Sequence, residues 1–293
     1  MADGLVLTRR VTERGVHDWA QRAGGASCAC AVREYVGYEE WATGGFLRKE
    51  VARSGVALIL GFGDGMDIYD GDVGSAARTM GAFVVGNQTR ASMTGVGGHQ
   101  LGVQVELTAA GALALFGDVE AYNDAVVPLH EALGADGPRL LDRLASAPSW
   151  DARLDLLDED FSAREVHALS PEVVWLRRQV DASRGSARVE PLMDETGWSR
   201  RHVTDAFRRQ IGLPPKTYAR LVRFRHAVAL LLDPDVGRTV VDVAVEAGYY
   251  DQSHLTREFA ALASATPGSY TAHAEVGPEV RFVQDPDRAD GAR

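Results

Sequence analysis

The sequence predicts an α+β protein of two domains, in which a β-rich barrel precedes an all-α domain. The 293-residue chain is longer than one core usually needs. Its first part alternates short apolar runs with glycine-rich turns, whereas nearly everything after Ser170 has helical periodicity. We expect a barrel over 1–117, a helical segment over 118–167, the all-α domain over 168–274 and an acidic, flexible tail over 275–293.

Short strands bounded by glycine dominate the first part of the chain. Val56–Leu60 and Met80–Val85 are clean apolar runs, and Gly102–Leu107 alternates apolar and polar residues with period two. Gly61–Gly65 could be read as a phosphate-binding loop, but it lacks a third glycine at the required place and no helix signal follows. We therefore expect a hairpin turn there.

The segment 118–167 carries three apolar stripes at helical spacing. Their members are Val126, Val127, Leu129, His130 and Leu133; Leu140, Leu141 and Leu144; and Trp150, Leu154, Leu157 and Phe161. Such stripes can pack on the domain's own sheet or form a seam between two copies. We favour the seam, and with it a homodimer.

Composition sets limits on function. Hydrophobic residues make up 45% of the chain, no apolar run is long enough to span a membrane, and no secretory signal is visible. Two cysteines, Cys28 and Cys30, are too few to staple a secreted fold, so a cytoplasmic protein without a membrane partner is expected. The net charge is −10, yet 171–273 holds 14 Lys and Arg against 12 Asp and Glu, so a basic face for nucleic acid remains feasible there.

An internal repeat marks the all-α domain. Phe207–Tyr218 aligns with Phe259–Tyr270, and its Phe, Pro and Tyr each recur 52 residues later. Upstream, Gly197 aligns with Gly248 at a spacing of 51, so the two turns differ in length by one residue. The domain therefore contains two copies of one supersecondary unit.

Each copy has the layout of a helix-turn-helix. A short helix, about Glu190–Thr196 and then Val240–Ala247, ends at a glycine that permits a positive φ. A second helix follows, with Ser199 or Asp251 as its N-cap. Between the copies, Pro215–Leu232 reads as one long helix that would fix the separation of the two units.

The second helix of each copy has one apolar and one polar face. Its polar N-terminus can enter the major groove of DNA, where arginine contacts guanine and glutamine contacts adenine. The candidate DNA-binding residues are Arg200, Arg201, Thr204 and Arg208 in the first copy, and Gln252, Ser253, His254 and Arg257 in the second; Asp205 is added by the family resemblance described next.

These features resemble the AraC/XylS family of bacterial transcription regulators. The resemblance covers about Val173–Ala272 and is strongest over Asp242–Phe259, which Thr266-Pro267 and Tyr270 follow. It implies a sequence-specific regulator, usually an activator, with double-stranded DNA and RNA polymerase as partners. The chain departs from the family pattern at Pro191, Met193, Asp205 and Ser264, the last of which replaces a customary glycine.

The front half more loosely resembles the cupin-like domains that accompany such modules. Gly102–Gly117 is the stretch that carries this resemblance, which implies a sensing or dimerising role. Five aromatic residues either line a pocket for a small-molecule effector or fill the core, and both readings stay open. They are Trp41, Phe46, Phe62, Tyr69 and Phe83.

Two other functions are compatible with parts of the sequence. A metal-dependent cupin enzyme with an accessory DNA module needs clustered histidines, but His17, His99, His130 and His167 are not paired at short spacing. We therefore expect no catalytic residue, metal or cofactor. The second rival is a protein-interaction module whose helix-turn-helix units no longer read DNA.

Overall fold

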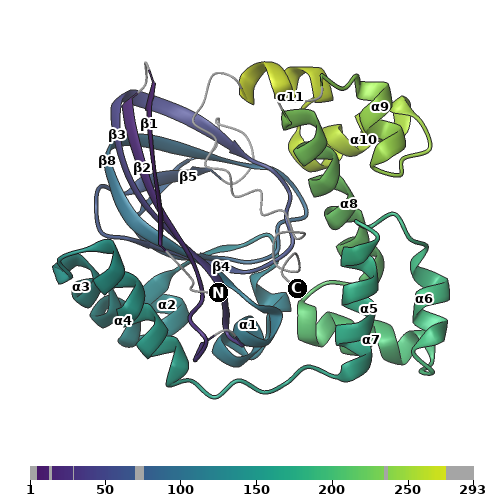
Figure 1. Ribbon diagram of the computed structural model, residues 1–293, viewed down its shortest axis with the longest axis horizontal. Helices are drawn as coiled ribbons and strands as arrows, with labels where there is room; N and C mark the ends of the chain where they lie inside the picture. The colour runs from purple at the N-terminus through teal and green to yellow at the C-terminus, as the bar shows by residue number, and fades with distance from the viewer. Residues whose placement is uncertain (1–4, 13–14, 29, 70–75, 234–236, 275–293) are drawn as a thin grey trace.

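The computed structural model of the protein describes residues 5–12, 15–28, 30–69, 76–233 and 237–274. It confirms the predicted α+β architecture, because a curved antiparallel sheet flanked by helices precedes a second domain that contains helices only (Figure 1). Within the described residues, no helix is long and apolar enough to cross a membrane.

The front domain is organised around its two longest strands, β3 and β8, which pair with each other along most of their length. In the described part of the chain, all strands belong to one nine-stranded sheet with β1 and β9 at its edges. The strands are β1 (Val6–Thr12), β2 (Gly15–Ala23), β3 (Val32–Glu50), β4 (Ala57–Gly61), β5 (Met66–Tyr69), β6 (Arg78–Met80), β7 (Ala82–Val85), β8 (Ser92–Leu107) and β9 (Val126–Pro128).

The segment 62–65 is not the hairpin turn that the sequence predicted. Both β4 and β5 pair antiparallel with β8, so they run in the same direction along one neighbour. Phe62 donates its backbone N–H to Leu101 at 2.8 Å, and Asp64 donates to His99 at 2.7 Å. The glycine-rich segment is therefore an irregular stretch within one interrupted strand.

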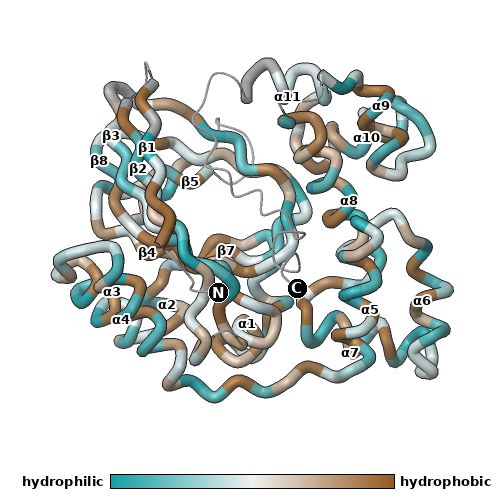
Figure 2. Tube along the Cα trace, in the orientation of Figure 1, coloured by the Kyte–Doolittle hydropathy of each residue, from teal (hydrophilic) through white to brown (hydrophobic). Residues whose placement is uncertain are grey.

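The two faces of the sheet differ in chemistry. One face packs its apolar side chains against the helices of the front domain, and β4 stands out in the hydrophobic colour (Figure 2). Gly37 lies on this face, where a Cβ would come within 2.6 Å of the Trp150 ring. The opposite face carries buried polar residues in register, including Glu40 beside Gln100.

Residues 118–162 belong to the front domain, not to a separate helical segment. Val126 and Val127 lie in strand β9 and pair with β7. Both are β-branched residues that favour strands, and the following helix begins only after Pro128, at Leu129. The short 3-10 helix η1 (Glu120–Tyr122) precedes this strand. The helices are α1 (Ala109–Phe116), α2 (Leu129–Leu133), α3 (Asp136–Ser146) and α4 (Trp150–Ser162).

The leucine stripes do not form the predicted seam between two copies. Leu140 and Leu144 of α3 and Leu154 and Leu157 of α4 are buried in one cluster with residues of the sheet, such as Val105. The sheet offers a larger apolar face than its strands could cover alone, so the helices pack on it.

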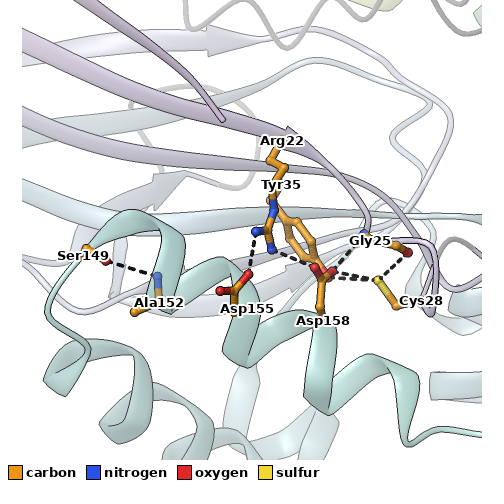
Figure 3. Close-up of polar contacts among 8 residues, drawn as sticks. All are labelled: Arg22, Gly25, Cys28, Tyr35, Ser149, Ala152, Asp155 and Asp158. Atoms are coloured by element: carbon orange, nitrogen blue, oxygen red, sulfur yellow. Dashed lines mark hydrogen bonds and ion pairs between the residues drawn. The ribbon is translucent and has the colours of Figure 1, made fainter. Parts of the chain in front are cut away.

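A polar cluster fixes α4 to the sheet (Figure 3). The Asp158 carboxylate accepts hydrogen bonds from the Arg22 guanidinium at 2.7 Å and the Gly25 amide at 3.0 Å. It also accepts from the Cys28 thiol and the Tyr35 hydroxyl, both at 2.9 Å. Burial raises the pKa of Cys28 to about 11, so this thiol is a neutral structural donor and not a reactive thiolate.

The second domain contains the two predicted helix-turn-helix units around one core. Its helices are α5 (Pro171–Ala182), α6 (Val189–Glu195), α7 (Arg200–Ile211), α8 (Pro215–Leu232), α9 (Val240–Glu246), α10 (Gln252–Ala263) and α11 (Pro267–Ala274). Helix α8 has the bounds that the sequence predicted and connects the two units (Figure 1). The predicted tail, 275–293, lies outside the described residues.

Candidate nucleic-acid interface

The turn of each unit depends on a glycine and a capping side chain. Gly197 has φ of 76° and Gly248 has φ of 77°, the left-handed region in which a Cβ is unfavourable. The Ser199 hydroxyl accepts the amide of His202 at 3.3 Å, and the Asp251 carboxylate accepts that of His254 at 2.7 Å. These caps start α7 and α10, as predicted.

The repeated Phe and Tyr make the same contact in both units. The rings of Phe207 and Tyr218 meet edge-on with centroids 5.5 Å apart, and those of Phe259 and Tyr270 do so at 5.9 Å. Phe224 of the connector α8 lies edge-on to Phe259 at 4.9 Å. The repeat is thus a structural one, in which each recognition helix packs its Phe on the helix that follows.

Tyr250 is the extra residue of the second turn. In the first unit Trp198 directly precedes the N-cap and contacts His202, whereas in the second Tyr249 contacts His254 and Tyr250 stands between Tyr249 and the N-cap. Tyr250 is 92% exposed at the start of α10. Tyr250 was not among the DNA-binding residues predicted from the sequence, although the change in repeat spacing from 51 to 52 residues lies at this position.

The exposed face of α7 is charged, and its arginines contact acidic neighbours. Arg200 makes a bidentate pair with Asp194, with distances of 2.7 Å and 2.6 Å. This hydrogen bond lowers the pKa of Asp194. Arg201 is the most exposed, with 93% of its side chain accessible, and lies 3.9 Å from Asp205. Arg208 pairs with an acidic residue of the front domain.

Thr204 is the least available of the predicted DNA contacts on α7. Its hydroxyl donates to the carbonyl of Arg200 at 2.8 Å, one turn earlier in the helix. A hydroxyl engaged in this way can still accept a hydrogen bond, but its own proton is committed.

The exposed face of α10 is mostly neutral. Gln252 and Ser253 are exposed in the first turn, and Arg257 lies one turn later, where its Nε donates to the Ser253 carbonyl at 3.3 Å. His254 is only half-exposed because its ring lies edge-on to Tyr249, 5.2 Å between centroids. Three of the four predicted contacts thus lie open, and His254 is partly shielded.

The five aromatic residues predicted for an effector pocket do not line one surface. Trp41 pairs with His99 of β8 and Phe46 pairs with Val96, so these two point to opposite faces of the sheet. Trp41 is 55% exposed and stacks on His99 at 3.8 Å. Tyr69 pairs with Met93 of β8, which puts it on the same face as Trp41. Phe83 pairs with Ile59 of β4, and Ile59 pairs with Gln104 of β8, which puts Phe83 on the face of Phe46. The register, which sequence alone did not give, separates them.

Across the described residues, no three metal-ligating side chains gather closely enough to hold an ion.

The second domain is similar in sequence to known helix-turn-helix proteins. Residues 192–273 match the family of helix-turn-helix domains. Over 64 residues the chain is 36% identical to the uncharacterized HTH-type transcriptional regulator YbfI of Bacillus subtilis strain 168, a match that covers 22% of each chain. Over 82 residues it is 32% identical to the F1 operon positive regulatory protein of Yersinia pestis, covering 28% of this chain and 27% of that one.

Among solved structures, ToxT from Vibrio cholerae is similar with a TM-score of 0.47 and 7% identity, over 81% of this chain and 97% of ToxT. The chain spans 22% and 27% of the lengths of the two curated relatives. The family match, by contrast, lies directly on the two units described above. Residues 192–273 of the second domain are therefore a helix-turn-helix domain, as predicted from the sequence.

Proposed function

We propose that the whole chain is a sequence-specific transcription regulator that reads two successive major-groove segments with α7 and α10. The observation that carries this proposal is the pair of matched units on one connecting helix. Helix α8 has 18 residues and is therefore about 27 Å long. A stiff connector of this size suits two recognition helices that enter the groove about 34–36 Å apart, one turn of DNA.

Binding would combine phosphate contacts with base readout. Cations such as Arg208 would pair with phosphates and release counterions, whereas Gln252, Arg257 and Arg201 have side chains able to contact base edges in bidentate fashion. Asp205 can accept a hydrogen bond from cytosine but repels phosphate. We add Tyr250 to this surface, because an exposed phenol beside the N-cap of α10 can donate to a phosphate oxygen.

The regulatory role that we propose is activation in the cytoplasm, in response to a small-molecule signal sensed by the front domain. One relative is called a positive regulatory protein, which supports activation and a contact with RNA polymerase. A homodimer remains part of the proposal, although the leucines that suggested it are buried in the front domain.

The experiment is a binding measurement on the full-length protein. A duplex of about 30 base pairs is selected from random-sequence DNA with the wild-type protein and compared with a scrambled duplex at physiological salt. We expect the selected duplex to bind at least about a thousandfold more tightly, the lower range for specific regulators. Equal affinity for both duplexes would contradict the proposal and favour a protein-interaction module.

A further inference from the structure

The front domain contacts the C-terminal end of the first recognition helix. The Asn123 amide donates to the carbonyl of Gly212 at 2.6 Å, and the Asn87 amide donates to the carbonyl of Ile211 at 3.2 Å. The two asparagines also bond to each other at 2.9 Å. The approach is close, because a Cβ on Gly212 would lie 2.9 Å from a methyl carbon of Val119. Carbonyls at the C-terminal end of a helix lack hydrogen-bond donors within the helix. Here the side-chain amides of Asn123 and Asn87 are the donors.

The second recognition helix is contacted at the corresponding end. The backbone N–H of Ala52, just after β3, donates to the carbonyl of Leu262 at 2.9 Å. The Lys49 ammonium donates to the carbonyl of Ser264 at 3.0 Å. Ala52 is fully buried and belongs to the hydrophobic core of the second domain. The front domain therefore contacts both recognition helices at their C-terminal ends.

A third contact reaches a DNA-facing side chain. Arg208 donates from Nε to Glu120 of η1 at 2.6 Å and pairs with the same oxygen through Nη2. Arg208 shares one helix face with Arg201 and Asp205, because these residues are spaced four and three apart. The hydrogen bond to Glu120 raises the pKa of Arg208. The Glu120 carboxylate thus pairs with the Arg208 guanidinium at one end of the helix face that would meet DNA.

We propose that the front domain restrains DNA binding through this contact, with Glu120 in the place of a DNA phosphate at Arg208. This inference rests on the proposed function of α7. DNA gains the phosphate contact of Arg208 only by displacing Glu120 from its guanidinium. The asparagine pair keeps η1 against the end of α7, so a movement of this part of the front domain would release both restraints together.

The test compares full-length variants on the selected duplex and on its scrambled counterpart. Glu120→Gln removes the charge and keeps the shape, so DNA affinity should rise about three- to tenfold. The slope of log affinity against log salt should steepen by about one, the value for one additional phosphate contact. Arg208→Ala should abolish both effects, so Glu120→Gln gains nothing in that background. Asn123→Ala changes no charge but loosens η1, so it should raise affinity and steepen the salt slope in the same direction as Glu120→Gln.

Glu131→Gln is the control, because it removes another exposed acid of the front domain, on α2, and should leave binding unchanged. The inference is overturned if Glu120→Gln binds like the wild type, or if its gain persists in the Arg208→Ala background. The scrambled duplex keeps the two proposals separate. A protein that does not prefer the selected duplex refutes specific recognition, while the salt slope on either duplex still reports whether Glu120 occupies Arg208.

Discussion

The two helix-turn-helix units share a framework and differ in what surrounds their recognition helices. Both use a left-handed glycine, an N-cap and a Phe–Tyr contact. Arg200, Arg201 and Arg208 of α7 face Asp194, Asp205 and Glu120, respectively. Arg257 of α10 bonds only to its own helix among the described contacts. Packing requirements thus fix the buried positions of the repeat, whereas the exposed faces of the two recognition helices differ in charge and in their contacts.

The largest expected effect is a loss of stability on replacing the glycine in the turn of the second unit, compared with the same change in the first. A Cβ at Gly248 would meet the Cβ of Ser186 at 2.7 Å, whereas a Cβ at Gly197 meets nothing within 4 Å. We expect Gly248→Ala to lower the free energy of unfolding by about 3 kcal/mol, from backbone strain plus overpacking. Gly197→Ala should cost about 1 kcal/mol from strain alone. Urea denaturation measures both.

The double variant Gly248→Ala with Ser186→Gly controls for the contact. It should recover the overpacking part of the loss and approach the Gly197→Ala value. Equal losses for the two single alanine variants would show that the second turn is not packed more tightly than the first.

Removal of one arginine from each recognition helix should have the next largest effect. Arg257→Ala should weaken binding to the selected duplex by about 2 kcal/mol and relax base preference at one position. Arg201→Ala should cost about 1 kcal/mol, because Asp205 already offsets part of its charge. Fluorescence anisotropy on duplexes with single base changes measures affinity and preference together. A uniform loss over all base changes would identify the residue as a phosphate contact instead.

Neutralisation of Asp205 should strengthen binding by the first unit. Asp205→Asn removes a like charge from the phosphate backbone, and we expect a gain of about 0.5–1 kcal/mol that shrinks at high salt. Glu246→Gln, on α9 and outside the recognition helices, is the control and should change little. A loss of affinity with Asp205→Asn would instead indicate that the carboxylate accepts a hydrogen bond from a base.

The smallest effect should come from Tyr250, which has no counterpart in the first unit. Tyr250→Phe removes one neutral donor and should weaken binding by about 0.5 kcal/mol on all duplexes, with an unchanged salt slope. Thermal unfolding should not change, since the side chain is 92% exposed. No effect on DNA affinity would remove Tyr250 from the interface.

Much of the second domain could be predicted from the sequence. Glycine, cap and aromatic positions recur in order, and each is required locally, so helix α8 was predicted with its observed bounds. The family resemblance placed Ser264 at a position where glycine is customary, and the structure shows its φ at 48°. The candidate residues of α7 and α10 followed from the same alignment.

The front domain was harder to predict because its organisation is non-local. Period-two alternation indicated strands, but it did not reveal that β4 and β5 share β8 as neighbour. Register decides which face a residue occupies, so the effector pocket was assigned to side chains on both faces. Glu120 and Arg208 are in contact but lie 88 positions apart in the sequence, so no local sequence pattern predicts this pair.

We propose that both units read DNA while helix α8 fixes their separation. The sequence motif enriched when full-length protein selects duplexes from random DNA tests this directly. We predict two conserved segments about 10–10.5 base pairs apart, centre to centre, and loss of only the second segment with Arg257→Ala. A single conserved segment, or a variable distance between two, would contradict the claim.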